Sequence, residues 1–290
     1  MDNRIVPDRL PMDTTQWILL PESRSGRHAL EVAARAAEAA GELLVEHVSE
    51  ERELRYKEGR ANIVTDVDVL AESQIISLLQ NEFPEHSVLS EETAAITNDS
   101  EYTWVVDPLD GTNNYVHGIP FCSVSIGLTD SYQVLLGVSY DPWQGELFVA
   151  QKGAGAWLNG QRIWVSERTT LEGSFIGCDM GYDIEASGAM MEGFRNSWPQ
   201  MSGLRIMGSS VLGLAYVACG RLDLYVHPHL YPWDMTSGIL LIKEAGGIVT
   251  DWDGEPASLY GKQIVAGNEA VHDLFMKLMK AEFQMGFSWT

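Results

Sequence analysis

Two aspartates three residues apart are the most informative chemical feature of this 290-residue chain. An apolar stretch runs into Asp107, Pro108 and Asp110, and then into Gly111 and Thr112. Because proline fixes φ and lacks a backbone donor, we expect Pro108 to end a strand and to hold both carboxylates on a stiff turn. The amides of Gly111 and Thr112 would offer hydrogen bonds to a phosphate. Carboxylates facing that phosphate would repel it unless cations lie between them.

Further acidic residues end two other apolar elements. Glu91 and Glu92 follow a short apolar run, and Asp234 precedes the apolar stretch Ile239–Ile242. Taken singly, the glutamates are typical of a solvated loop and the aspartate is typical of a helix N-cap. Taken with the aspartate pair, they predict an all-oxygen site for a hard divalent cation, Mg²⁺ or Mn²⁺ rather than zinc. Two such ions about 3.5 to 4 Å apart can bind both the attacking and the leaving oxygen of a phosphoryl displacement.

The overall charge argues against several kinds of partner. The chain has 19 Lys and Arg against 41 Asp and Glu, a formal net charge of −22. This excess opposes binding to nucleic acid or to an anionic membrane, because like charges repel. The three cysteines lack paired spacing, which is typical of reduced thiols. The apolar runs are shorter than the roughly 18 residues of a membrane span. We therefore expect a soluble, cytoplasmic protein.

The elements that must position these acids change in type along the chain. Residues 1–25 are polar and aperiodic and predict a flexible arm. Apolar periodicity and composition predict helices at 28–48, 68–81, 189–198, 211–218, 234–245 and 269–283. Runs of β-branched and aromatic residues predict strands at 103–106, 121–128, 133–140, 146–150, near 175, and at 204–207, 222–226, 247–250 and 263–266. The pair Asn159-Gly160 predicts a hairpin with a type I′ turn.

The order of these elements predicts an α/β protein with two sheets. The early strands follow one another without long helices between them, which favours an antiparallel sheet, whereas the later strands alternate with helices. We expect a domain at 26–168 that carries most of the acids and a second at 169–290 that supplies Asp234 and a substrate wall. Helices on both sides of each sheet would bury the many apolar faces.

Two segments of the chain resemble the signature motifs of a known family. Trp104–Tyr115, and the segment from Trp233 through Glu244 to Gly247, are similar to those of the inositol monophosphatase family, and the similarity extends over residues 28–280. The family consists of Mg²⁺-dependent, lithium-sensitive phosphatases related to fructose-1,6-bisphosphatases and bisphosphate nucleotidases. The resemblance implies a layered α-β-α-β-α fold, a homodimer and two to three Mg²⁺ ions.

The resemblance also implies a role for each acid. Glu91, Asp107 and the carbonyl of Leu109 would hold one metal ion, and Asp107, Asp110 and Asp234 would hold a second. Glu91 would also contact a weaker third ion. These assignments make the acids ligands rather than turn or cap residues.

The same resemblance assigns residues to the water and the phosphate. The attacking water would lie near Glu91 and Thr112, and Asp68, chosen over Asp66 by its spacing from Glu91, would orient the Thr112 hydroxyl to accept its proton. The amides of Gly111 and Thr112 would bind the phosphate.

Supporting roles fall to residues around this centre. Glu92 would orient ligands without binding metal, and Lys57 would lie near the metal loop. Ser210 would line the substrate, and Asp179 is a further candidate for that wall. We expect a small phosphorylated substrate, with no nucleic-acid or membrane partner.

One position departs from the family pattern. Inositol-specific relatives have a glutamate seven residues before the aspartate of the second signature, where this chain has His227. A histidine there is either an ordinary loop residue or a donor to a sugar oxygen or second phosphate. Three hypotheses remain open: a sugar or polyol phosphatase, a fructose-1,6-bisphosphatase or bisphosphate nucleotidase, and a regulatory protein that binds metal without turnover.

Overall fold

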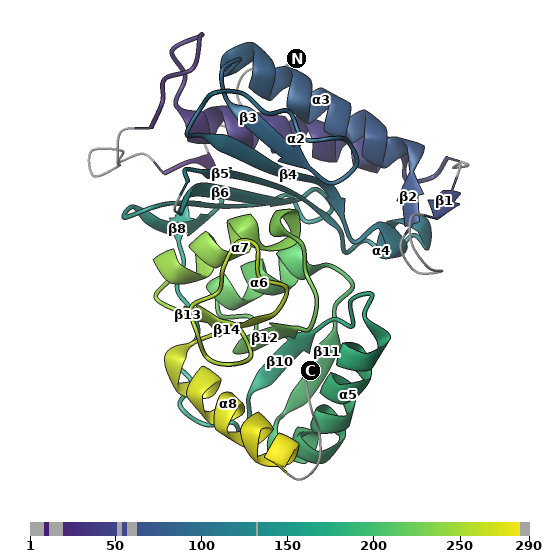
Figure 1. Ribbon diagram of the computed structural model, residues 1–290, viewed down its shortest axis with the longest axis vertical. Helices are drawn as coiled ribbons and strands as arrows, with labels where there is room; N and C mark the ends of the chain where they lie inside the picture. The colour runs from purple at the N-terminus through teal and green to yellow at the C-terminus, as the bar shows by residue number, and fades with distance from the viewer. Residues whose placement is uncertain (1–8, 12–19, 51–53, 57–62, 132, 285–290) are drawn as a thin grey trace.

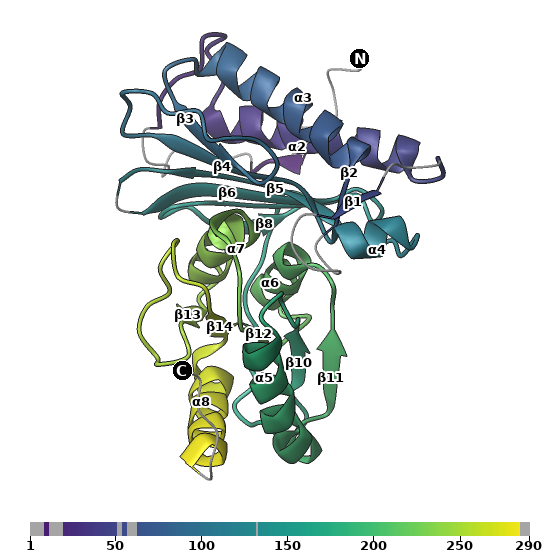
Figure 2. The same ribbon diagram turned by 45° about the vertical axis from the view of Figure 1, so that its right-hand side comes forward.

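Helices and sheets alternate in five layers in the computed structural model, which describes residues 9–11, 20–50, 54–56, 63–131 and 133–284. Figures 1 and 2 show the order α-β-α-β-α. The outer helices over the first sheet are α2 (Ala29–His47) and α3 (Asp66–Glu82). The central helices are α6 (Ser210–Ala218) and α7 (Pro232–Glu244), and the outer helices over the second sheet are α5 (Ile184–Ser197) and α8 (Glu269–Gln284). The expected fold class is confirmed.

The first sheet has seven strands in the order β3-β4-β5-β6-β7-β8-β9. Its strands are β3 (Ser87–Ser90), β4 (Thr103–Asp110), β5 (Ser123–Thr129), β6 (Val134–Asp141), β7 (Glu146–Gln151), β8 (Gly155–Leu158) and β9 (Gln161–Arg162). All neighbouring pairs are antiparallel except β3 and β4, which are parallel. Asn159 and Gly160 have φ of 47° and 76°, which confirms the hairpin turn.

The second sheet has five strands in the order β11-β10-β12-β14-β13. They are β10 (Phe175–Cys178), β11 (Gly203–Ile206), β12 (Leu224–His227), β13 (Ile248–Thr250) and β14 (Ile264–Gly267). β10 pairs in parallel with β11 and β12, whereas β14 is antiparallel to β12 and β13, so this sheet is mixed. A short hairpin, β1 (Leu54–Tyr56) with β2 (Ile63–Thr65), leads into α3.

Pro108 does not end its strand, so that prediction was wrong. β4 continues to Asp110, and its register with β5 shifts between Asp107 and Asp110. A proline has no donor for the ladder, but an irregular stretch of pairing does not require one. The short helix α4 (Thr112–Val116) begins two residues after Asp110. The two carboxylates are therefore held by a paired strand rather than by a free turn.

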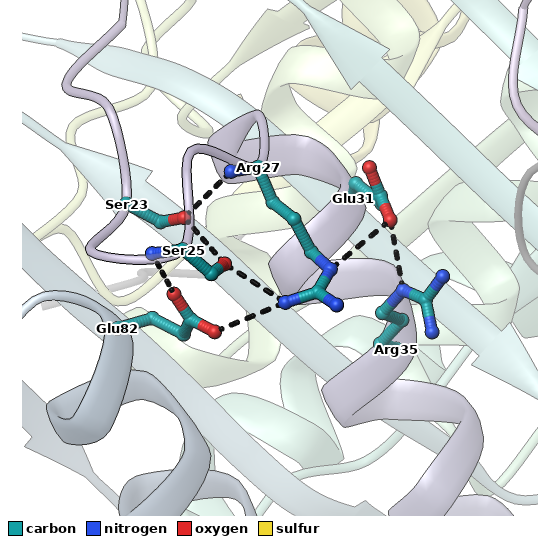
Figure 3. A network of polar contacts seen from close by, with 6 residues as sticks. All are labelled: Ser23, Ser25, Arg27, Glu31, Arg35 and Glu82. Carbon is teal, nitrogen blue, oxygen red and sulfur yellow. Dashed lines mark hydrogen bonds and ion pairs between the residues drawn. The ribbon is translucent and has the colours of Figure 1, made fainter. Parts of the chain in front are cut away.

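Apolar side chains fill three clusters: one between each outer helix layer and its sheet, and one around the central helices that reaches both sheets. Figure 3 shows polar contacts that join the segment before α2 to the end of α3: the Ser25 amide donates to Glu82 Oε2 at 3.0 Å, and Arg27 Nη1 lies 3.4 Å from Glu82 Oε1. Upstream, Leu10 and Leu20 contact the first cluster. The described parts of the expected arm thus pack on the body of the protein. The division at residue 168 stays a prediction.

Within the described ranges, none of the helices is both long and apolar enough to cross a bilayer.

Candidate active site

A cavity of about 260 Å³ opens where β4 ends and where α6 and α7 begin. Both halves of the chain contribute to its wall. It brings together Glu91, Asp107, Leu109, Asp110, Gly111, Thr112, Ser210, His227 and Asp234 from the sequence prediction. Glu92 does not line it, and Lys57 lies outside the described residues.

Three carboxylates crowd one side of the cavity. Oxygens of Asp107, Asp110 and Asp234 lie within 4.8 Å of one another. Burial, together with the charges of Glu91 and the neighbouring aspartates, raises the pKa of Asp107 well above its usual range. The pKa of Asp234 is raised for the same reasons. Three like charges at this separation are mutually destabilising.

Among the described residues, one oxygen of Asp107 has no hydrogen-bond partner. Its Oδ1 accepts a hydrogen bond from the Leu109 amide at 3.0 Å, whereas among the described residues the buried Oδ2 has no hydrogen-bond partner. A buried carboxylate oxygen without a donor is costly unless a cation binds it. The donor set is carboxylate and carbonyl oxygen, which hard divalent cations prefer. The residues present therefore fit a Mg²⁺ or Mn²⁺ site.

Asp110 also anchors the first turn of α6. Its carboxylate accepts hydrogen bonds from the amides of Ser210 (3.2 Å) and Val211 (3.0 Å) and from the hydroxyls of Ser209 and Ser210. Burial raises the pKa of Asp110 to about 6, although these hydrogen bonds act in the opposite direction. These contacts engage the roughly four lone-pair sites of the carboxylate, so a cation bound by Asp110 would take the place of a serine hydroxyl. Ser209, which the sequence analysis did not single out, belongs to this arrangement.

Asp234 lies at the third position of α7 rather than at the expected N-cap, and its carboxylate both caps the helix and faces the cluster. It lies in the first turn of α7, where its Oδ2 accepts a hydrogen bond from the Tyr231 amide at 2.7 Å in a capping box. It also belongs to the carboxylate cluster with Asp107 and Asp110. The cap fixes the direction in which the side chain points, because it ties the carboxylate to its own helix terminus.

Asp68 and Thr112 form a hydrogen-bonded pair at the edge of the cluster. Thr112 Oγ1 lies 3.1 Å from Asp68 Oδ1 and 3.1 Å from the Leu109 carbonyl oxygen. Asp68 is buried at the start of α3, where its carboxylate also accepts the Thr65 amide at 3.0 Å, and burial raises its pKa to about 6. Asp66, which the spacing rejected, is exposed to solvent.

Gly111 has a conformation and a position that a side chain would disturb. Its φ is +92°, and a Cβ built there would lie 2.9 Å from the Gly208 carbonyl oxygen. Glycine is therefore required where the chain turns from β4 into α4. Gly111 and Thr112 both border the cavity.

Glu72 holds the loop that carries Glu91, and the sequence analysis missed it. Its Oε1 accepts hydrogen bonds from the Ser90 hydroxyl and from the amides of Glu92 (2.9 Å) and Thr93 (3.3 Å). Glu72 is fully buried on the inner face of α3. A charged residue on the apolar face of a helix was the signal in the sequence that could have found it.

The remaining wall comes from the second half of the chain. Asp179 accepts the Gly208 amide at 2.6 Å and the Tyr225 hydroxyl at 2.7 Å, and burial raises its pKa to about 7. His227, at the end of β12, is buried, and its Nδ1 accepts the His229 amide at 3.0 Å. Burial lowers the pKa of His227 to about 3, so its ring is neutral.

A layered α/β fold that gathers buried carboxylates at one cavity is the architecture of metal-dependent phosphatases. The model of the Inositol monophosphatase family matches residues 27–283. The chain therefore belongs to the inositol monophosphatase family and is a phosphatase that hydrolyses phosphoric monoesters. The family resemblance expected from the two signature segments is confirmed.

Individual relatives agree over most of their length. An inositol-1-monophosphatase of Mesorhizobium japonicum is 39% identical over 254 residues, which cover 87% of this chain and 96% of that protein. A fructose-1,6-bisphosphatase/inositol-1-monophosphatase of Thermotoga maritima is 34% identical, with coverage of 86% and 95%. The crystal structure of the extragenic suppressor protein suhB from Bartonella henselae superposes with a TM-score of 0.83 at 39% identity, with coverage of 86% and 97%.

Proposed function

We propose that the protein is a Mg²⁺-dependent phosphomonoesterase for a small sugar or polyol phosphate. The observation that carries this proposal is the cluster of Asp107, Asp110 and Asp234, whose oxygens lie within 4.8 Å of one another, with Asp107 Oδ2 lacking a donor among the described residues. Divalent cations bound there would neutralise phosphate oxygens and make water a better nucleophile. Manganese suits the same donors.

The proposed ligands follow the family resemblance. Glu91, Asp107 and the Leu109 carbonyl would hold one ion, and Asp107, Asp110 and Asp234 a second, while Glu91 would contact a third, weaker one. The five residues proposed as metal ligands all border the same cavity, which supports this assignment. Glu92, whose amide donates to Glu72, would help to order the loop beside them.

Proton transfer would fall to Thr112 and Asp68. The Thr112 hydroxyl donates its proton to Asp68 Oδ1. The lone pairs of Thr112 Oγ1 are therefore available to accept a hydrogen bond from a water in the cavity. As that water loses a proton, Asp68 would take up the threonine proton, because burial raises the pKa of Asp68 to about 6. Both residues would act only when Asp68 is ionised.

The phosphate would contact the amides of Gly111 and Thr112. Ser210 and His227 would contact the leaving group, since both border the same cavity. By the same family resemblance we propose a cytoplasmic homodimer.

Phosphate release tests this proposal. Inositol 1-phosphate, fructose 1,6-bisphosphate and 3′-phosphoadenosine 5′-phosphate would each be supplied with Mg²⁺ or with EDTA. We expect release that requires Mg²⁺ and that millimolar lithium inhibits. No phosphate release from any of the three substrates would favour the remaining hypothesis, a protein that binds metal without turnover.

A second candidate, fructose 1,6-bisphosphate or a nucleotide bisphosphate as substrate, has one supporting observation. The Thermotoga maritima relative carries both phosphatase names. The ratio of rates in the same assay separates this candidate from a sugar or polyol monophosphatase.

A further inference from the structure

A row of hydroxyl groups lies between the seven-stranded sheet and α7. Ser125 on β5 is the cross-strand partner of Asp107 on β4 and of Ser139 on β6, so these three side chains share one face of the sheet. Ser237 on α7 packs against that face. The three serines are fully buried, where a hydroxyl without a hydrogen-bond partner would be costly. Their hydrogen bonds therefore help to fix α7 on the sheet.

One order of donation satisfies all three hydroxyls. Ser139 Oγ donates to Ser237 Oγ at 2.9 Å. Ser125 Oγ lies 2.8 Å from Ser237 Oγ and 3.3 Å from the Trp233 carbonyl oxygen, which can only accept. Because each hydroxyl has a single proton, Ser125 donates to the carbonyl and Ser237 donates to Ser125. The hydrogen bonds thus run from Ser139 through Ser237 and Ser125 to Trp233, and each proton is used once.

Ser125 connects the strand that carries Asp107 to the helix that carries Asp234. It pairs with Asp107 across the sheet, and its hydroxyl donates to the carbonyl of Trp233, the residue immediately before Asp234. Oxygens of the two aspartates lie within 4.8 Å of each other. Apolar packing is non-directional and determines mainly how close α7 lies, whereas a hydrogen bond also restricts how the helix is turned and shifted. The Ser125 hydroxyl is therefore placed to fix the two carboxylates relative to each other.

We propose that Ser125 is a positioning residue for the metal site, and that it sets the separation of Asp107 and Asp234 for a small cation. Mg²⁺ requires nearly ideal octahedral geometry with ligand distances of about 2.0–2.1 Å, whereas Ca²⁺ accepts flexible geometry at about 2.3–2.6 Å. Ligands that are held less firmly therefore lose affinity for Mg²⁺ more than for Ca²⁺. This inference rests on the proposed function and adds the residue that makes the site selective for Mg²⁺.

Calorimetric titration of Mg²⁺ and of Ca²⁺ into the metal-free full chain, without substrate, tests the inference. Ser125→Ala should raise the Kd for Mg²⁺ by about tenfold or more, as for other residues that orient ligands, and the Kd for Ca²⁺ by less than about threefold. The measurement requires no turnover, so its result does not depend on the identity of the substrate.

Ser139→Ala is the matched control. It removes the same hydroxyl group from the same buried interface, but Ser237 can still donate to Ser125, and Ser125 to Trp233. Both variants should lower Tm by similar amounts, whereas only Ser125→Ala should change the ratio of the two Kd values. Ser125→Cys keeps a weak donor, so it should change the ratio less and in the same direction. It replaces the alanine variant if circular dichroism shows that the latter does not fold.

The ratio of the two Kd values separates a positioning role from a merely structural one. An unchanged ratio in the Ser125 variants, or the same change in Ser139→Ala, would overturn the inference and leave the proposed function intact, because the serines would then only stabilise the interface. A wild-type protein that binds neither ion would contradict the proposed function, and the inference would fall with it.

Discussion

Asp107 lies at the centre of the carboxylate cluster and shows why the site needs a cation. The side chain is 1% exposed, and among the described residues one of its oxygens lacks a donor. Glu91, Asp110 and Asp234 add repulsion to the loss of hydration. Both effects favour protonation or the binding of a positive ion. At neutral pH, a divalent cation would relieve the repulsion without removing the charges that bind it.

We predict that Asp107→Asn abolishes turnover without harming the fold. The amide removes a charge from the proposed contact of two metal ions, so kcat should fall by about 10²- to 10³-fold or more. In EDTA, Tm should equal or exceed that of the wild type, because a source of repulsion is gone. Thermal unfolding followed by circular dichroism provides the measurement, and a strongly lowered Tm would contradict the ligand role.

A second prediction concerns stability against pH without metal. The folded-state pKa values of Asp68 and Asp110 are raised to about 6, and burial and neighbouring carboxylates raise those of Asp107 and Asp234 well above the ordinary 3.8. Groups raised in this way stabilise the fold below their unfolded pKa, and that stability is lost as pH rises through the folded pKa. In EDTA, the free energy of unfolding should therefore fall from pH 5 toward pH 8.

Mg²⁺ should abolish most of this fall in the free energy of unfolding. The unfolding free energies with and without Mg²⁺ are best compared above a pH of about 6.5, the ordinary pKa of histidine. Below it, buried neutral histidines such as His227 act in the opposite direction, because their folded pKa is lowered. Urea unfolding at several pH values, with and without Mg²⁺, measures both slopes. If the free energy of unfolding without metal stays constant or rises above this pH, the carboxylates are not crowded as described.

At the scale of elements, the parallel pair β3 and β4 brings an acidic loop and an acidic strand end to one edge of the sheet. Strands that run in parallel end at the same side, so Glu91 after β3 and Asp107 within β4 both reach the cavity. Helix α3 completes the arrangement because Glu72 accepts hydrogen bonds from the loop after β3. The loop is thereby attached to a helix rather than left to solvent.

Replacement of Glu72 should weaken metal binding without touching a proposed ligand. Glu72→Ala leaves three donors unpaired and should cost roughly 1–3 kcal/mol in the free energy of unfolding. The Mg²⁺ concentration for half-maximal activity should rise by about tenfold or more, as for other residues that orient ligands. Glu72→Gln keeps an acceptor oxygen and should recover much of both losses. Identical behaviour of the two variants would show that the hydrogen bonds are not the cause.

At the scale of the whole molecule, the position of Asp234 depends on how closely α7 approaches the seven-stranded sheet. Gly127 and Gly137 are cross-strand partners, and they leave room for the helix. A Cβ built on Gly137 would lie 2.7 Å from Ser237 Cα. The Ser237 hydroxyl contacts Ser125 Oγ at 2.8 Å and Ser139 Oγ at 2.9 Å in this interface. The distance between the sheet and α7 thus determines where Asp234 lies.

Gly137→Ala should push α7 away from the sheet. Because the clash is with backbone, we expect a loss of about 1–3 kcal/mol in the free energy of unfolding, and weaker Mg²⁺ binding. Gly188→Ala on α5 is the matched control, since a Cβ there meets nothing within 4 Å. It should be neutral or stabilising by up to about 1 kcal/mol. Urea unfolding and Mg²⁺ titration compare the two variants, and equal effects would refute the packing argument.

Local patterns in the sequence predicted most helices and strands, the Asn159-Gly160 hairpin, and the acids that gather at the cavity. These features depend on residues close together in the chain, such as apolar spacing within one helix or the two residues of a turn. The signature segments then identified the family. Pro108 was misread because the local rule that proline ends a strand does not hold where the pairing is irregular.

Only the tertiary structure decided how those acids are held. Asp110 anchors α6 through Ser210, which is 100 residues away in sequence, and Glu72 holds a loop about twenty residues further along. The orientation of the His227 ring likewise depends on a folded backbone amide. Such contacts form because packed layers bring distant elements together, and the residues within each element carry no local pattern that specifies the partner. Residue type determined the chemistry that is available, and the packing of the layers determined its geometry.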